Sequence, residues 1–230
     1  MSNDKFSFYK EHPKTCEADD FWGQVKRTVN GKPVSQDQID MIVTAVVKGL
    51  ALNDQDTLLD LCCGNGALST LLFDHCRGGI GIDFSKHLIE IANKNFAKIG
   101  SRMFYLDDVV DACSSISEPE RFTKAVCYGS FPYLEAGRAE LLLSTLNIRY
   151  PKLSRVFIGN CPDKKLAADF FGDREYSENL LSDPSSAIGV WRTFDEFIAL
   201  AATCGWQAEV RKMPSNYYAA HYRYDIILIK

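Results

Sequence analysis

The chain has 230 residues, of which 46% are hydrophobic and 12% aromatic, and this is enough to fill one sizeable core. Its net charge is −4, and the 26 lysines and arginines form no basic stripe, which argues against nucleic acid as the main partner. No run approaches the roughly 20 apolar residues that span a bilayer, and no signal-peptide core follows the first methionine. We therefore predict a cytoplasmic protein with a small-molecule partner, without contact to a membrane.

Eight cysteines are spread from Cys16 to Cys204 in a chain without a secretion signal, so we expect reduced thiols. No Cys-x-x-Cys pair and no compact cysteine and histidine cluster appears. The sequence therefore predicts no structural metal. It gives no indication of the oligomeric state.

The first 34 residues are polar and aromatic without a regular period, and we interpret residues 1–34 as an N-terminal flap. Ser35 and Gln38 have the spacing of a capping box, which predicts a helix from about Gln36 to Leu50. Residues 35–230 then form the main domain.

From Thr57 onward, short apolar runs alternate with helical stretches, which is typical of parallel βαβ units. The pattern predicts an α/β fold built from parallel βαβ units. We expect seven strands, at Thr57–Cys62, Gly79–Ile82, Met103–Leu106, Lys124–Tyr128, Arg155–Gly159, Gln207–Met213 and Arg223–Ile229. We expect further helices at Ala67–His75, Ala136–Ile148 and Thr193–Cys204, with residues 163–190 as a weakly patterned insertion.

One more helix is predicted to begin after Ser85 and to stop at Gly100. Its buried face should contain five apolar residues with helical spacing: Leu88, Ile89, Ala92, Phe96 and Ile99.

The strongest functional signal is the run Asp60-Leu61-Cys62-Cys63-Gly64-Asn65-Gly66, in which a buried strand turns through small residues into a helix. Glycine there allows the backbone to turn sharply and to approach a ligand closely. The next strand ends in Asp83, a carboxylate placed to accept hydrogen bonds from ribose hydroxyls. The strand after that ends in Asp107 and Asp108.

From about Thr57 to Gly159, these motifs resemble in order and spacing the class I S-adenosylmethionine-dependent methyltransferases. The Asp-Leu-Cys-Cys-Gly-Asn-Gly run is especially similar to that of the menaquinone and ubiquinone methyltransferases. The resemblance implies a doubly wound, Rossmann-like α/β fold, in which a mostly parallel seven-stranded sheet has an antiparallel last strand and helices on both faces. It also implies S-adenosylmethionine as cofactor and methyl transfer as activity. A similarity of the segment from Trp22 to Pro33 to bacterial methyltransferases suggests a sugar or a secondary metabolite as acceptor.

The resemblance also implies roles for individual residues. Asp60 would orient the motif or meet the methionine amino group through water, and Asp83 would hold the ribose. Arg27 could pair with the methionine carboxylate through its planar guanidinium, or be an exposed side chain of the flap. The remaining cofactor-binding residues would be Cys62, Cys63, Gly64 and Gly66 in the turn, and Phe84, Asp108, Val109 and Tyr128 after the later strands. Cys62 departs from the family pattern, since many members have the first glycine there.

Two residues on the acceptor side are candidates for catalysis. Tyr133 ends a Ser-Phe-Pro-Tyr run that resembles the Asn-Pro-Pro-Tyr motif of amino-group methyltransferases, although the asparagine and the first proline are missing. We interpret this run as an acceptor-side loop, and a plain turn remains the alternative for Tyr133. His221 is the preferred base because its ordinary pKa of about 6.5 suits proton uptake near neutrality. A packed or solvent-facing histidine is the alternative.

Two other classes of function remain open, namely a different enzyme on the same scaffold and a non-catalytic binding module. A nicotinamide-dependent oxidoreductase would also use a glycine-rich turn and an acidic residue, but Ser69 stands where its fingerprint expects a third glycine. An aminopropyltransferase could be built on the same scaffold. A non-catalytic module that binds S-adenosylmethionine would share every cofactor residue and would transfer no methyl group.

Overall fold

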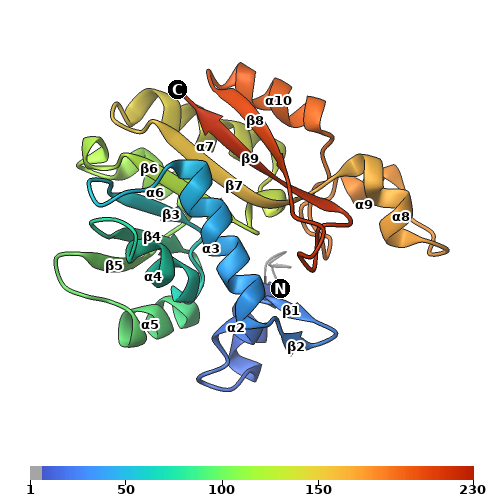
Figure 1. Ribbon diagram of the computed structural model, residues 1–230, viewed down its shortest axis with the longest axis horizontal. Coiled ribbons are helices and arrows are strands. Elements are labelled where there is room, and N and C mark those ends of the chain that lie inside the picture. Colours follow the sequence, from blue (N-terminus) through green and yellow to red (C-terminus); the bar gives the residue numbers. More distant parts are fainter. Residues whose placement is uncertain (1–6) are drawn as a thin grey trace. The chain divides into compact units, whose positions relative to one another are not determined.

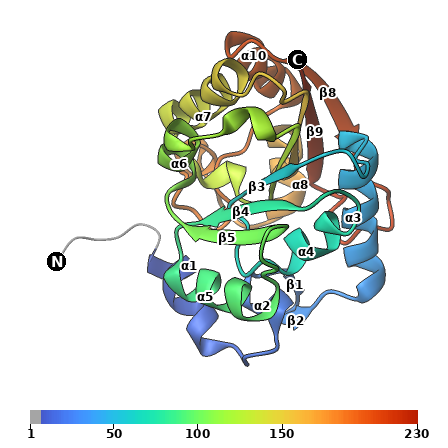
Figure 2. The same cartoon turned by 90° about the vertical axis from the view of Figure 1, so that its left-hand side faces the viewer.

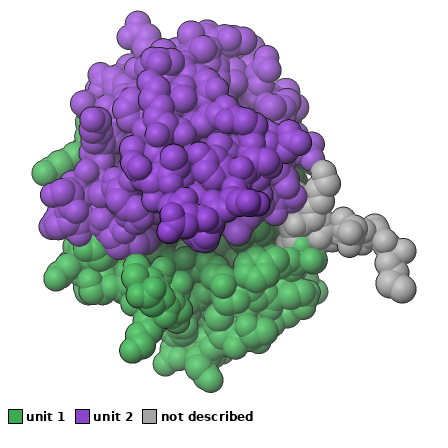
Figure 3. All heavy atoms as spheres, turned by 90° about the vertical axis from the view of Figure 1, so that its right-hand side faces the viewer, with its two compact units in different colours: residues 1–112 green, residues 113–230 purple. Residues whose placement is uncertain are grey.

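The structure is a computed structural model that describes residues 7–230. The chain divides into two compact units, residues 1–112 and 113–230, coloured separately in Figure 3. The predicted seven-stranded, mostly parallel α/β sheet is present. Its strands are, in order, β5 (Arg102–Leu106), β4 (Gly79–Asp83) and β3 (Leu58–Leu61) in the first unit, and β6 (Lys124–Tyr128), β7 (Arg155–Pro162), β9 (Arg223–Ile229) and β8 (Gln207–Lys212) in the second. In the described residues, no helix is long and apolar enough to cross a membrane, and all eight cysteines are free thiols.

The first unit contains three parallel strands, which Figure 2 shows side by side with helices α4 and α5 next to them. Both helices connect consecutive strands, as the alternating apolar pattern predicts. The elements are β3 (Leu58–Leu61), α4 (Ala67–Phe73), β4 (Gly79–Asp83), α5 (Lys86–Asn95), β5 (Arg102–Leu106) and α6 (Val109–Ser115). Every residue of β3 and β4 is buried, so this part of the sheet is core.

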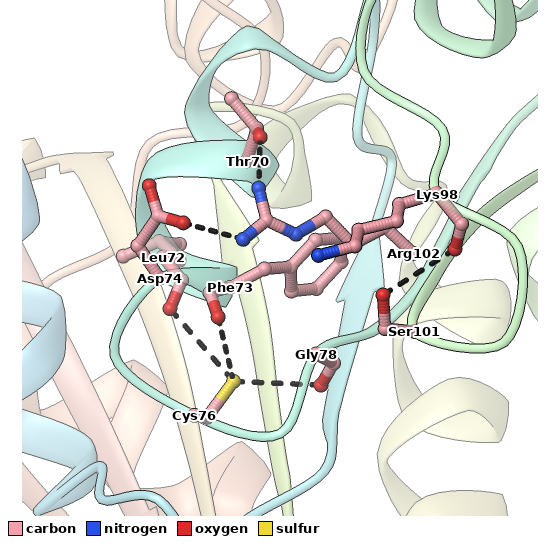
Figure 4. A network of polar contacts seen from close by, with 9 residues as sticks. All are labelled: Thr70, Leu72, Phe73, Asp74, Cys76, Gly78, Lys98, Ser101 and Arg102. Atoms are coloured by element: carbon pink, nitrogen blue, oxygen red, sulfur yellow. Dashed lines mark hydrogen bonds and ion pairs between the residues drawn. The ribbon is translucent and has the colours of Figure 1, made fainter.

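The C-terminal end of α4 is tied to the start of β5 by side chains (Figure 4). The Arg102 guanidinium donates to the Thr70 hydroxyl at 2.8 Å and forms an ion pair with Asp74. The Cys76 thiol donates to the carbonyl of Gly78 at 3.4 Å. These contacts fix the turn that leads from α4 into β4.

Helix α3 (Gln36–Leu50) has the predicted bounds. The predicted capping box is wrong, because the Ser35 side chain makes no hydrogen bond to the first turn although Ser35 is the N-cap residue. The C-cap residue of α3 is Ala51, which has the left-handed conformation. Before α3 come α1 (Ser7–Glu11), η1 (His12–Thr15), α2 (Phe21–Gln24), β1 (Thr28–Val29) and β2 (Lys32–Pro33).

The predicted face of α5 is partly wrong. Leu88, Ile89 and Ala92 are buried as expected, but the helix ends at Asn95 and the Ile99 side chain is 96% exposed. Ile99 lies in the connection that leads into β5, where helical spacing no longer determines which side chains are buried.

In the second unit, β6 and β7 are parallel, whereas β9 is antiparallel to both β7 and β8. The antiparallel last strand is therefore confirmed, with β8 at the sheet edge. The elements are η2 (Pro119–Arg121), β6 (Lys124–Tyr128), η3 (Phe131–Tyr133), α7 (Ala136–Arg149), β7 (Arg155–Pro162), α10 (Phe194–Thr203), β8 (Gln207–Lys212) and β9 (Arg223–Ile229). Helix α10 begins with a capping box of Thr193 and Glu196 that the sequence analysis missed.

The weakly patterned insertion, residues 163–190, folds into η4 (Lys164–Leu166), α8 (Ala167–Phe171) and α9 (Glu178–Leu181). It has a small core of its own, in which Ala167, Leu181 and Trp191 are buried. Phe170 packs against Tyr222 with ring centroids 4.4 Å apart. Aromatic packing thus holds the insertion to the segment before β9.

Candidate functional site

The turn after β3 adopts the left-handed conformation at three positions, with φ of 62° at Cys62, 58° at Gly64 and 77° at Gly66. A Cβ atom on Gly66 would lie 2.8 Å from the Phe104 ring, and one on Gly64 would lie 2.9 Å from Val25. Both glycines are therefore required by space and by backbone conformation. Side chains are thereby excluded at both positions of the turn, which allows a ligand to approach the backbone closely.

Cys62 has the left-handed conformation, which favours glycine over residues with a side chain. For a residue with a side chain this conformation costs about 1–2 kcal/mol. Cys63, by contrast, is buried, and its N–H donates to the Ile82 carbonyl at 2.9 Å, which joins the turn to β4. Burial raises the pKa of the Cys63 thiol well above its usual value, so this thiol stays protonated.

Asp83, at the end of β4, is 6% exposed and accepts two backbone hydrogen bonds. Gly64 N–H donates to Oδ2 at 2.9 Å, and Ser85 N–H donates to Oδ1 at 2.8 Å. Burial raises the pKa of Asp83 to about 6, while these two bonds lower it. A carboxylate has about four acceptor positions, so each oxygen keeps one for a ligand hydroxyl.

Asp60, in β3, is 4% exposed and accepts a hydrogen bond from the Ser69 hydroxyl at 2.5 Å. Burial raises the pKa of Asp60 to about 7, against the lowering effects of Ser69 and of the Arg27 charge. The Arg27 guanidinium is half-buried and lies 5.5 Å from the centre of the Trp22 ring. Asp60 therefore ties β3 to α4, and Arg27 adds a positive charge to its surroundings.

Asn65, between the two glycines of the turn, is a site residue that the sequence analysis missed. Its side chain is 1% exposed and donates to the Phe21 carbonyl at 2.7 Å and to the Gln24 side chain at 2.8 Å. Gln24 in turn donates to the carbonyl of Glu17 at 3.0 Å. The turn thus holds residues 17–24 directly. The sequence feature that could have indicated this role is an amide side chain between the two glycines of the turn.

A hollow of about 390 Å³ lies next to the end of β4 and the end of β5. Phe84 lines it, and the Lys10 ammonium lies 5.4 Å from the centre of the Phe84 ring. Asp108 also lines it, while its Oδ1 accepts the Val110 N–H at 2.8 Å at the start of α6. Val109 is 5% exposed. The other lining residues are Glu11, Lys14, Ser85, Lys86, His87, Leu106 and Asp107.

In the second unit, Tyr128 ends β6 and is 7% exposed. Its hydroxyl shares a hydrogen bond of 2.9 Å with the hydroxyl of Tyr217. Burial raises the pKa of the Tyr128 hydroxyl well above its usual value, so this hydroxyl remains protonated. Tyr128 thus links the end of β6 to the segment before β9.

The two candidate catalytic residues have different neighbours. The Tyr133 hydroxyl donates to the Ala187 carbonyl at 3.0 Å and so connects the acceptor-side loop to the insertion. His221 is exposed, and its ring centroid lies 4.7 Å from that of Tyr222. Among the described residues, no group of three or more histidine, cysteine, aspartate or glutamate side chains could hold a metal ion.

A family described as methyltransferase domain matches residues 58–147, which include the glycine turn, Asp83 and Asp108. Residues 58–147 are thus similar in sequence to a methyltransferase domain. An uncharacterized methyltransferase of Schizosaccharomyces pombe is 43% identical over 49 residues, which are 21% of this chain and 19% of that protein. A second one from the same organism is 37% identical over 43 residues, 19% of this chain and 15% of that protein. The matched part is therefore about a fifth or less of these relatives.

Solved methyltransferase structures share the fold. An S-adenosylmethionine-dependent methyltransferase of Leishmania major has a TM-score of 0.68 at 15% identity and covers 98% of this chain and 83% of its own. Magnesium protoporphyrin IX methyltransferase from Synechocystis, solved with bound S-adenosylmethionine, has a TM-score of 0.60 at 14% identity. The match covers 99% of this chain and 97% of that one. The small RNA methyltransferase HEN1 has a TM-score of 0.62 at 14% identity. The match covers 86% of this chain and 25% of that one.

Proposed function

We propose that this protein transfers a methyl group from S-adenosylmethionine to a small-molecule acceptor. The observation that supports this proposal most directly is the hydrogen bond from Gly64 N–H to the Asp83 carboxylate. It places a buried acceptor group beside a turn in which Gly66 leaves no room for a side chain. A nucleoside with ribose hydroxyls fits this combination.

In this proposal the first unit binds the cofactor. Asp83 accepts hydrogen bonds from the ribose, Phe84 covers the adenine, and Asp108 with the Val109 backbone contacts the adenine amino edge. The hollow beside Phe84 supports this assignment, because it opens between the strand ends that carry Asp83 and Asp108. Open α/β sheets bind ligands at such carboxyl ends.

The methionine part of the cofactor is assigned to Asp60, Arg27 and the backbone of the turn. Asp60 positions the turn through Ser69, as its short hydrogen bond supports. Arg27 supplies a guanidinium for the methionine carboxylate, since its charge already acts on Asp60.

When bound, S-adenosylmethionine supplies a methyl group on a positively charged sulfur, which is already activated for transfer. The protein mainly has to align the acceptor, and such alignment contributes up to about 7–11 kcal/mol of barrier reduction. His221, the base candidate from the sequence, would contribute about 10²- to 10⁴-fold for an acceptor that loses a proton. Its exposed position makes it accessible to solvent, so we assign it a lesser part.

A small acceptor, such as a sugar or secondary metabolite, is supported by charge and by the insertion. The net charge of −4 disfavours a polyphosphate chain as substrate. The aromatic core of the insertion and the Tyr133 contact to Ala187 give the acceptor side an ordered, apolar border. Connecting loops of this kind set substrate choice on a rigid sheet.

A transfer assay tests the proposal. The purified protein is incubated with S-adenosylmethionine labelled on the methyl group, together with panels of small hydroxyl and amine compounds and, separately, small RNA. We expect label in at least one small molecule and none in RNA. Label in RNA alone would contradict the small-acceptor assignment, and S-adenosylmethionine binding without transfer to any compound would indicate a non-catalytic module.

A further inference from the structure

Strands β7 and β9 lie side by side in the sheet (Figure 1). Their pairing is interrupted near the carboxyl end of β7, where the register shifts between Ile158 and Cys161. Asn160 lies in this bulge with φ of 65°. A bulge bends the strand and redirects side chains, and bulges are frequent next to active sites. Backbone strain of this kind at a residue other than glycine is a reason to look for function.

The backbone groups of Asn160 form hydrogen bonds, whereas its side-chain oxygen does not. Its N–H donates to Asp225 Oδ1 at 2.8 Å, and its carbonyl accepts a hydrogen bond from the Arg223 guanidinium. Its side-chain oxygen Oδ1 is buried and has no hydrogen-bond partner among the described residues. An unsatisfied buried acceptor costs about 1–3 kcal/mol, so a ligand that donates a hydrogen would gain from binding there.

Asp225 provides a second hydrogen-bond acceptor in the same place. It is 5% exposed and lies in β9, opposite the end of β7. Burial raises its pKa to about 7, while the hydrogen bond from Asn160 lowers it. The ionisable groups around it are the Tyr128 hydroxyl of β6, the Cys161 thiol of β7 and the Arg223 guanidinium of β9.

Asn160 also borders the acceptor-side loop. Strands β6 and β7 are parallel, and Gly129, which follows β6, donates its N–H to the Gly159 carbonyl at 3.0 Å. A Cβ atom on Gly129 would lie 3.7 Å from Asn160 Nδ2. The amide is therefore at the carboxyl edge of the strands, where ligands of α/β sheets bind.

We propose that Asn160 and Asp225 form a subsite that accepts the hydrogen of a hydroxyl group on the methyl acceptor. This proposal rests on the proposed function. The Asp225 carboxylate repels an anion, so the subsite suits a neutral donor better than an anionic one.

Phenol is the probe for this subsite, and anisole, which has the same ring without the donor hydrogen, is its control. Binding of both to the full chain is measured by ligand-observed NMR with and without S-adenosylhomocysteine. The test variants are Asn160→Gly, which keeps the left-handed backbone, and Asp225→Asn, which keeps an oxygen for the Asn160 N–H. Asp195→Asn is the matched control, because that carboxylate is 82% exposed.

We expect phenol to bind the wild type and Asp195→Asn equally, and at least tenfold more weakly to each test variant, whereas anisole binds all four proteins equally weakly. Phenol binding no tighter than anisole binding, or phenol binding unchanged in both folded variants, would overturn the proposal. Calorimetry with S-adenosylhomocysteine separates the two proposals, since its affinity should be the same in all four proteins. Failure of the wild type to bind S-adenosylhomocysteine refutes the proposed function, while the phenol comparison still tests the subsite. If one variant does not fold, the other decides.

Discussion

Gly64 donates its backbone N–H to the Asp83 carboxylate across 2.9 Å, although the two residues are 19 positions apart in the chain. This bond joins the turn after β3 to the end of β4. The other carboxylate oxygen accepts the N–H of Ser85 before α5. Asp83 thus fixes the shape of the turn in addition to its proposed contact with the ribose.

Replacing Asp83 should therefore affect both the turn and the ligand. Asp83→Ala removes the ribose acceptors and leaves the Gly64 N–H without its partner, so we expect the affinity for S-adenosylhomocysteine to fall at least tenfold in calorimetry. Asp83→Asn keeps one oxygen and should lose less affinity. Unchanged affinity of the folded Asp83→Ala variant would refute the placement of the ribose.

The stability of the protein should fall as pH rises because of Asp60. Its pKa is raised by burial to about 7 from 3.8, so the folded chain holds this proton more tightly than the unfolded chain. The resulting stabilisation is complete below about pH 4 and is lost as pH rises to about 7. Asp83, with a pKa raised to about 6, adds to the loss in the same direction.

Asp60→Asn cannot ionise, and its amide oxygen can still accept the Ser69 hydroxyl. We expect its free energy of unfolding in urea to exceed that of the wild type by about 1–3 kcal/mol at pH 8, and to be nearly equal at pH 4. The exposed Asp54→Asn serves as control and should follow the wild type at both values. A variant that is equally destabilised at both pH values would contradict this account.

Alanine substitutions at two glycines test whether the turn requires glycine: one lies in the turn, and the other lies in α7, where a Cβ atom has room. Gly66→Ala places a Cβ atom 2.8 Å from the Phe104 ring at a φ of 77°, so we expect lower stability and at least tenfold weaker S-adenosylhomocysteine binding. Gly137→Ala, in α7, has no atom within 4 Å of the new Cβ and should stabilise the helix by about 0.5–1 kcal/mol without changing binding. Equal binding by both variants would contradict the need for glycine at position 66.

Asn65 should hold the segment of residues 17–24 on the turn. Asn65→Ala removes its bonds to Phe21 and Gln24 and should raise hydrogen exchange of that segment about tenfold, since unsatisfied buried groups cost about 1–3 kcal/mol. Asn147→Ala, which loses one amide bond to the Gly205 carbonyl, is the control and should leave the segment protected. Exchange that is the same in both variants would show that other contacts hold the segment.

Regular elements with long apolar patterns could be predicted well from the sequence. Strands β6 and β9 and helix α3 have the predicted bounds because a continuous period covers each of them. Ile99 was assigned wrongly because the period was extended past the end of α5 at Asn95. A local pattern does not show where a helix ends when the chain turns away to pair as a strand.

The place of the glycine turn after β3 and of Asp83 at the end of β4 could be predicted, because their spacing follows from one strand, one turn and the next strand. Their part in binding a cofactor stays a prediction. The contacts of Asn65 and Asn160 could not be predicted. Asn65 meets Gln24 across 41 residues, and Asn160 meets Asp225 across 65. The Asn65 contact depends on tertiary packing, and the Asn160 contact depends on a bulge. Neither feature leaves a periodic signal in the sequence.

The most direct test of the central claim is isothermal calorimetry of the wild-type chain with S-adenosylhomocysteine and, separately, with NAD. Our account predicts micromolar or tighter binding of S-adenosylhomocysteine and no binding of NAD. Binding of NAD without binding of S-adenosylhomocysteine would contradict it and would assign the glycine turn to an oxidoreductase.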